Sequence, residues 1–146
     1  MISPAPSLTL YAETSAVLRV LLEGDKSLGT LLAGATRLVT STLTFVEADR
    51  GLRRARTERR LDTRQFTRGE RWLAGFARAC DAMPLTDAVL DRAKRDCPVE
   101  PVRTLDALHL ASIRLWDERI GEITVASTDQ RVRANAAAWG FALVPP

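Results

Sequence analysis

The chain has 146 residues, a net charge of +3 and a hydrophobic fraction of 46 %. This length fits one domain, which we place at residues 1–146, and the apolar content excludes wholesale disorder. The apolar runs are too short to cross a bilayer, and the N-terminus lacks the basic start and apolar stretch of a secretory signal. We therefore expect a cytoplasmic protein in which Cys80 and Cys97 are free thiols.

The first third of the chain alternates short β-rich runs with helix-forming segments. Residues 8–13 predict a strand, and a helix follows from Thr14 to about Glu23. A short helix is expected over 27–33. The β-branched run 36–41 predicts a second strand.

The middle of the chain predicts an arm of two helices at about residues 44–80. Apolar positions at helical spacing indicate helices over 44–56 and 66–80, and the polar residues 57–64 indicate a turn between them. Nine arginines and three acids lie within 50–71, a net charge of +6, whereas the rest of the chain carries 12 basic and 15 acidic residues. Such a patch suits phosphate backbones; the alternatives are a solvated helical hairpin or a surface for an acidic protein.

The C-terminal part returns to the alternation of strands and helices. The expected strands are 82–86, 122–128 and 141–145, and the expected helices are 87–96, 104–119 and 129–139. Short apolar strands that alternate with helices favour a parallel sheet covered on both faces. In such sheets ligands bind in the crevice beyond the carboxyl ends of the strands, so the chemistry is expected at this edge.

Four acids are expected at that edge of the sheet: Glu13, Glu47, Asp106 and Asp129. Each has a structural explanation when taken alone. Thr44 and Glu47 fit a capping box, and both aspartates suit helix N-termini. Together, however, four carboxylates repel one another and raise each other's pKa. A hard divalent cation such as Mg²⁺ or Mn²⁺ removes that repulsion.

The single histidine, His109, lies three residues after Asp106 among apolar neighbours. It is either a general base or a packed, hydrogen-bonded helix residue, and its surroundings favour the second interpretation. The chain has neither a GxxxxGK[ST] phosphate loop nor a GxGxxG fingerprint, which argues against a nucleotide cofactor.

Four parts of the sequence resemble the PIN-domain ribonucleases, in particular the VapC-type toxins of bacterial toxin–antitoxin pairs. They are, in order, "LYAETSAVLRVLL", "TSTLTFVEADRGL", "RTLDALHLASIRL" and "ITVASTDQRV" with "WGFALV". The resemblance spans essentially the whole chain, and "RTLDALHLAS" and "STDQRV" are its most specific pieces. The first motif departs from the family pattern, because Glu13 stands where the family usually has Asp.

The resemblance implies a three-layer α/β/α fold with a central parallel sheet, and cleavage of RNA that depends on Mg²⁺ or Mn²⁺. All four acids are then catalytic residues. Carried over by motif, Glu13 and Asp106 are the principal metal ligands. Glu47 and Asp129 complete the acidic pocket, directly or through water.

The resemblance also implies partners and supporting residues. The hydroxyls of Thr14 and Thr128 would orient water or a carboxylate. The expected partners are an RNA substrate, a cognate antitoxin protein and a second copy of the chain in a homodimer, without a membrane. The RNA backbone or the antitoxin would contact arginines of the arm, namely Arg53, Arg54, Arg59 and Arg60.

A second interpretation is a PIN-like module that binds RNA or protein with weak or no nuclease activity. Glu13 motivates it, since the extra methylene moves the carboxylate by roughly 1.5 Å, and a misplacement of about 1 Å can cost on the order of 100-fold in rate. A response-regulator receiver domain also gathers acids at strand ends, but it needs a late lysine, and none follows Lys94.

Overall fold

The computed structural model of the chain describes residue 1 and residues 7–146. The expectation that no secretory signal is present rests partly on residues 2–6 and lies to that extent outside the described residues. Within the described part, no helix is long and apolar enough to cross a membrane.

Within residues 7–146, five parallel strands form one central sheet, in the order β3-β2-β1-β4-β5. The strands are β1 (Thr9–Ala12), β2 (Arg37–Ser41), β3 (Cys80–Met83), β4 (Ile123–Ala126) and β5 (Ala142–Val144). The central strand β1 pairs with β2 on one side and with β4 on the other, so Tyr11 lies opposite both Val39 and Val125. The chain therefore leaves β1 toward one edge of the sheet and later returns to fill the other.

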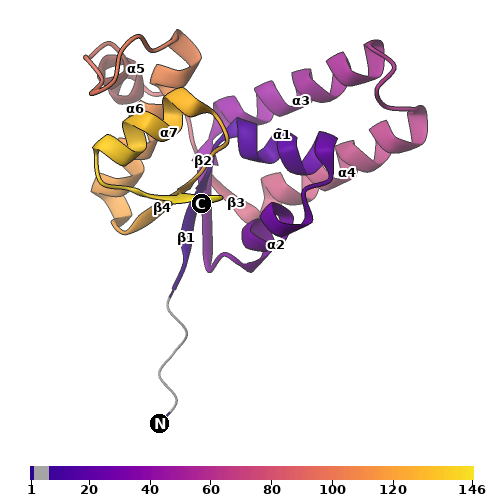
Figure 1. Cartoon of the computed structure of the whole chain (residues 1–146), viewed down its shortest axis with the longest axis horizontal. Helices are drawn as coiled ribbons and strands as arrows, with labels where there is room; N and C mark the ends of the chain where they lie inside the picture. The colour runs from indigo at the N-terminus through magenta and orange to yellow at the C-terminus, as the bar shows by residue number, and fades with distance from the viewer. Residues whose placement is uncertain (2–6) are drawn as a thin grey trace.

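In the described part of the chain, seven helices cover the two faces of this sheet (Figure 1). They are α1 (Thr14–Glu23), α2 (Lys26–Gly34), α3 (Thr42–Thr57), α4 (Thr63–Ala79), α5 (Asp87–Ala93), α6 (Thr104–Ile120) and α7 (Gln130–Ala138). Helices α1 to α4 share one apolar cluster and α5 to α7 share a second. The predicted three-layer α/β/α architecture is confirmed.

The alternation of side chains along β1 explains why there are two clusters. Leu10 and Ala12 point into the cluster of α1 to α4, whereas Tyr11 points into the cluster of α5 to α7, and all three are fully buried. A strand buried on both faces has no place for a charge in its interior. The first charged residue, Glu13, accordingly comes where β1 ends.

Several predicted boundaries are corrected by the structure. The capping box at Thr44 and Glu47 is wrong, because α3 begins two residues earlier and Ser41 is its N-cap, accepting a hydrogen bond from the Leu43 amide at 3.1 Å. Helix α6 begins at Thr104 as predicted, and its N-cap residue is Arg103, which makes no side-chain bond to the backbone. The strand predicted at 82–86 is β3, which begins directly after α4.

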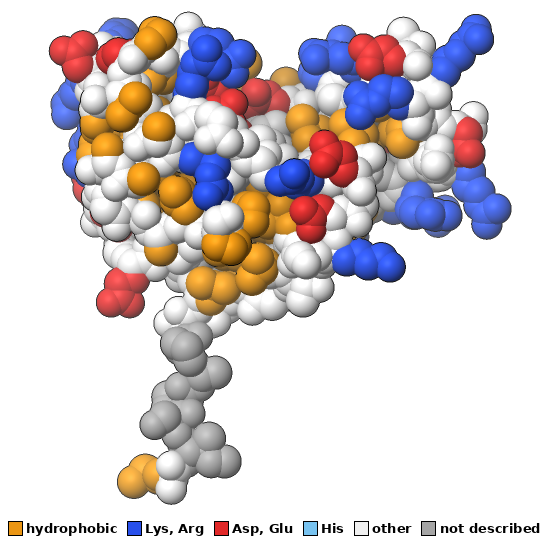
Figure 2. Space-filling view, viewed as in Figure 1, with side chains coloured by type: hydrophobic (Ala, Val, Ile, Leu, Met, Phe, Trp, Pro, Cys, Tyr) orange, Lys and Arg blue, Asp and Glu red, His pale blue; other side chains and the backbone are white. Residues whose placement is uncertain are grey.

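The predicted arm is a hairpin of α3 and α4 that extends beyond the sheet (Figure 1). Helix α4 begins at Thr63, three residues earlier than predicted, because Asp62 and Gln65 form a capping box. Gly69 allows the two helices to approach, since an added Cβ would lie 2.7 Å from Leu52. All nine arginines of residues 50–71 are exposed, and Figure 2 shows basic side chains spread around the outer part of the arm.

Candidate active site

Three of the four acids expected at the carboxyl edge of the sheet lie next to the boundary between β1 and β4. Glu13 is the N-cap of α1, and its amide donates to the carbonyl of Ala126 at 3.0 Å, which ties the two strand ends together. Asp106 lies in the first turn of α6, and Asp129 is the N-cap of α7. This boundary is the switch point of the sheet, where such folds bind ligands. Helix N-termini also favour negative charge there.

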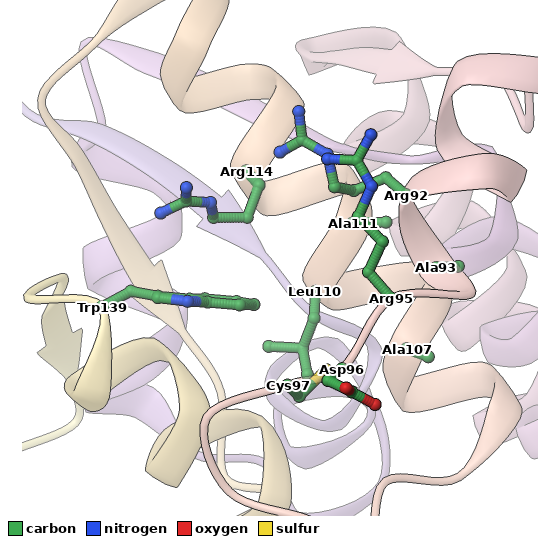
Figure 3. A pocket seen from close by; sticks show the side chains of 10 residues that line it. All are labelled: Arg92, Ala93, Arg95, Asp96, Cys97, Ala107, Leu110, Ala111, Arg114 and Trp139. Carbon is green, nitrogen blue, oxygen red and sulfur yellow. The ribbon is translucent and has the colours of Figure 1, made fainter.

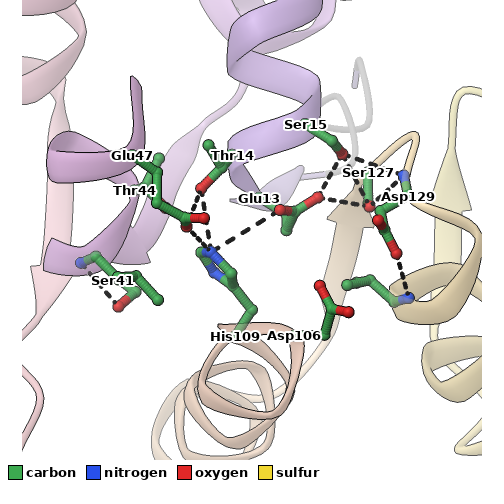
Figure 4. A network of polar contacts seen from close by, with 12 residues as sticks. Glu13, Thr14, Ser15, Ser41, Thr44, Glu47, Asp106, His109, Ser127 and Asp129 are labelled. Carbon is green, nitrogen blue, oxygen red and sulfur yellow. Dashed lines mark hydrogen bonds and ion pairs between the residues drawn. The ribbon is translucent and has the colours of Figure 1, made fainter. Parts of the chain in front are cut away.

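Two serines hold the carboxylate of Glu13, which is 5 % exposed. The hydroxyl of Ser127 donates to it at 2.8 Å, and the hydroxyl of Ser15 donates to the same oxygen. Ser15 in turn accepts from the backbone amides of Thr128 at 2.8 Å and Asp129 at 3.2 Å. Glu13 is therefore fixed by neutral donors from both sides of the switch point (Figure 4). No role for these serines was predicted from the sequence. The signal that was overlooked is their position within two residues of Glu13 and Asp129.

His109 lies between the two glutamates. Its Nε2 atom is 2.6 Å from Glu47 and 3.8 Å from Glu13, and its Nδ1 atom is 2.9 Å from the hydroxyl of Tyr11. The Thr14 hydroxyl donates to Glu47 at 2.7 Å and lies 3.1 Å from the same Nε2 atom. The single histidine is thus a hydrogen-bonded helix residue at the centre of the acidic edge, and Thr14 orients a carboxylate.

This network changes the pKa of two of its members. Partial burial alone would raise the pKa of Glu47, but the hydrogen bond and charge of His109, together with the bond from Thr14, outweigh it and lower that pKa. Burial, and secondarily the charge of Glu13, raise the pKa of Tyr11 well above its ordinary value. Glu47 is therefore held as a carboxylate, and Tyr11 keeps its proton.

Arg103 bridges the remaining two acids. Its Nε donates to Asp106 at 3.1 Å, and a terminal guanidinium nitrogen lies 3.5 Å from Asp129. The hydrogen bond and the charge of Asp106 raise the pKa of Arg103. Asp129 also caps α7 through the amides of Arg131 and Val132.

The donor chemistry of this edge fits a hard divalent cation. All four acids offer carboxylate oxygens, which Mg²⁺ and Mn²⁺ prefer. The guanidinium of Arg103 stands in for a cation between Asp106 and Asp129. Within the described residues, no three Asp, Glu, His or Cys side chains lie close enough together to form a ready-made metal site. The residues thus fit such an ion by chemistry, with Arg103 occupying the space between two of the acids.

A groove lies beside helix α1. It has a volume of about 440 Å³, and its lining includes Ser15 and Thr128, which are close in sequence to the acids, and Arg60 from the α3–α4 turn. None of the four acids lines this groove. Arg53, Arg54 and Arg59 are exposed elsewhere on the arm. The structure thus places one of the four predicted arginines, Arg60, in the same groove as Ser15 and Thr128.

A separate pocket lies between α5, α6 and α7 (Figure 3). Its volume is about 170 Å³, and its lining includes Arg92, Arg95, Arg114 and Trp139. The guanidinium of Arg114 stacks on the Trp139 ring at 5.0 Å. None of the four acids lines this pocket, so it is not part of the acidic edge.

The fold and the site define a class of protein: a parallel three-layer α/β domain with carboxylates gathered at its switch point. The family model of the PIN domain matches residues 10–138, and the chain belongs to this family, whose members are generally nucleases. A chain in the crystal structure of VapBC2 from Rickettsia felis bound to a DNA fragment from their promoter is similar in fold. The TM-score is 0.63 at 8 % identity, over 93 % of this chain and 97 % of that one. A comparison with curated proteins gives no match.

Proposed function

We propose that the chain is a Mg²⁺- or Mn²⁺-dependent endoribonuclease and the toxin of a toxin–antitoxin pair. The observation that carries this proposal is the convergence of Glu13, Asp106 and Asp129 on the switch point of a PIN-domain sheet. The similarity in fold to a chain of a VapBC2 complex supports the toxin part of the proposal.

In this proposal Glu13 and Asp106 hold the cation, with Asp129 and Glu47 in support. When bound there, a divalent cation would lower the pKa of a water molecule and offset the charge that develops at the scissile phosphate. The chain's own residues hold the carboxylates in place and keep Glu47 ionised. Ser15 and Ser127 fix Glu13, and the His109 network fixes Glu47. Hydrolysis by water leaves a 5′-phosphate and a 3′-hydroxyl.

The arginine arm is the proposed contact for RNA or for the antitoxin. The groove that holds both Thr128 and Arg60 supports a path for an RNA strand between the arm and the residues beside the acids. Guanidinium groups bind phosphates through paired hydrogen bonds, which suits exposed arginines on both helices. A homodimer is expected from the family and is tested by light scattering of the purified chain.

The experiment is cleavage of total RNA by the purified chain with Mg²⁺ or Mn²⁺, compared with Asp106→Asn. The amide keeps the size of the side chain but removes the anionic ligand, so we expect cleavage to fall at least 100-fold. Asp117→Asn, at the far end of the same helix α6, is the matched control and should cut like the wild type. Equal cutting by Asp106→Asn and the wild type would refute the assignment.

A PIN-like binding module with weak or no nuclease activity is the second candidate. It is favoured by the two serines that hold Glu13 and by the guanidinium between Asp106 and Asp129, because all three acids already have partners. Calorimetric titration with Mn²⁺ separates the two candidates. Absence of binding at millimolar Mn²⁺, with RNA binding intact, would favour the module.

A further inference from the structure

Arg103 covers the acidic edge from the solvent side. Its side chain is 65 % exposed, whereas the side chains of Asp106 and Asp129 are 10 % and 24 % exposed. The guanidinium therefore closes a site whose acids are largely buried. In the part of the chain that the structure describes, these two carboxylates are the ion-pair partners that Arg103 has.

The position of Arg103 in the fold allows its side chain to be displaced from the acids. It is the N-cap of α6 and makes no side-chain bond to the helix backbone, so among the described residues its polar contacts are its ion pairs with Asp106 and Asp129. Ion pairs of exposed arginines contribute little to stability. Because guanidinium stays protonated at all ordinary pH values, only another cation or a new anionic partner can remove it from the acids.

We propose that Arg103 occupies the place of a cation between Asp106 and Asp129 and is displaced from it when a divalent ion binds. This inference rests on the proposed function, since it needs the acids to bind such an ion. A divalent cation brings twice the charge to the same oxygens, so it competes favourably with one exposed guanidinium. Once displaced, Arg103 remains at the rim of the site, where an RNA phosphate can become its partner.

The competition sets the direction of the expected effect. Removing Arg103 deletes both the competing cation and its repulsion of the incoming ion, so divalent affinity should rise. Arg103 also holds two like charges together before the ion arrives, which acts in the opposite direction. We expect the loss of competition to dominate, because the ion itself bridges the carboxylates when it binds.

The test is Mn²⁺ binding by calorimetry and by electron paramagnetic resonance, without RNA. We expect Arg103→Gln to bind Mn²⁺ about tenfold more tightly than the wild type, and Arg103→Lys to bind about as the wild type does. Arg131→Gln, which removes an exposed arginine two residues from Asp129, is the matched control and should change affinity less than twofold. The rise in Tm on adding Mn²⁺ should likewise be larger for Arg103→Gln.

The outcomes separate this inference from the proposed function. If the wild type binds Mn²⁺ and Arg103→Gln binds it equally or more weakly, the competition is overturned while the metal site stands. An equal gain in Arg131→Gln would overturn it too, since the effect would then be general electrostatics. If neither the wild type nor Arg103→Gln binds Mn²⁺, both the inference and the metal-dependent function fall.

Discussion

Glu13→Asp and Glu13→Gln together test whether the site is built around the longer acid. The aspartate keeps the charge but shortens the side chain, whereas the glutamine keeps the length but loses the charge. The structure predicts that the shorter acid loses stability, because Glu13 is held by the hydroxyls of Ser15 and Ser127. We expect Glu13→Asp to be the less stable variant and Glu13→Gln to be the less active one.

The magnitude follows from the contacts of the carboxylate. A retreat of roughly 1.5 Å lengthens the 2.8 Å bond from Ser127 beyond hydrogen-bonding range. Hydrogen bonds to a charged group contribute about 1.5–3 kcal/mol each. An aspartate at the N-cap of α1 regains about 1 kcal/mol by capping the helix. Both serines donate to the oxygen that retreats, so the loss of their two bonds exceeds the gain from capping. We expect a net cost of about 2 kcal/mol, since water compensates for part of the loss.

Urea unfolding and RNA cleavage measure the two effects separately. A cost of about 2 kcal/mol lowers the urea midpoint by about 1 M. Capping also draws the Asp carboxylate toward α1, so we expect cleavage to fall on the order of 10- to 100-fold. Glu13→Gln retains both serine bonds and should lose about 1 kcal/mol, with cleavage lower than in Glu13→Asp. If Glu13→Asp is as stable as the wild type and cleaves as fast, the serines do not fix Glu13 and the reasoning is wrong.

Two further predictions concern Glu47 and the arm. Because the pKa of Glu47 is lowered from 4.5 in the folded state, its ionised form stabilises the fold fully above about pH 4.5, and this is lost as the pH falls through the folded value. The stability difference between the wild type and Glu47→Gln in urea should therefore shrink in acid; a difference independent of pH would contradict it. Replacing the four predicted arm arginines by Ala should reduce the salt slope of RNA binding by up to about 3. An unchanged slope would exclude the arm as the phosphate contact. These arginines are Arg53, Arg54, Arg59 and Arg60.

The architecture could be predicted from the sequence because it depends on local patterns. Short apolar runs between helical segments predict a parallel sheet covered on both faces, and β1 shows why, since its successive side chains enter two different cores. The end of β1 was predictable for the same reason: Glu13 is the first residue that such a strand cannot bury. Helix starts were less predictable, because Ser41, Thr42 and Thr44 are all acceptable caps and tertiary contacts select among them.

The partners of the acids could not be predicted, because they come from distant parts of the chain. Ser127 lies 114 positions from Glu13, and Tyr11 lies 98 positions from His109. Glu47 illustrates the limit well. Its sequence context indicates a local capping role, but the fold turns it toward Thr14 and His109 instead. Charge counting identifies acids that need compensation, and only the fold shows which groups provide it.

The nature of those groups bears on what the acidic edge is for. A buried pair of ions that served stability alone could be replaced by apolar residues at little cost. Here Glu13 is held by neutral hydroxyls. In the ion pair of Arg103 with Asp106, the Arg103 side chain is 65 % exposed and the Asp106 side chain is 10 % exposed. Because an exposed ion pair contributes little, this guanidinium can be displaced from Asp106 and Asp129 at small cost in stability. The arrangement therefore supports the proposal that these two acids bind a cation.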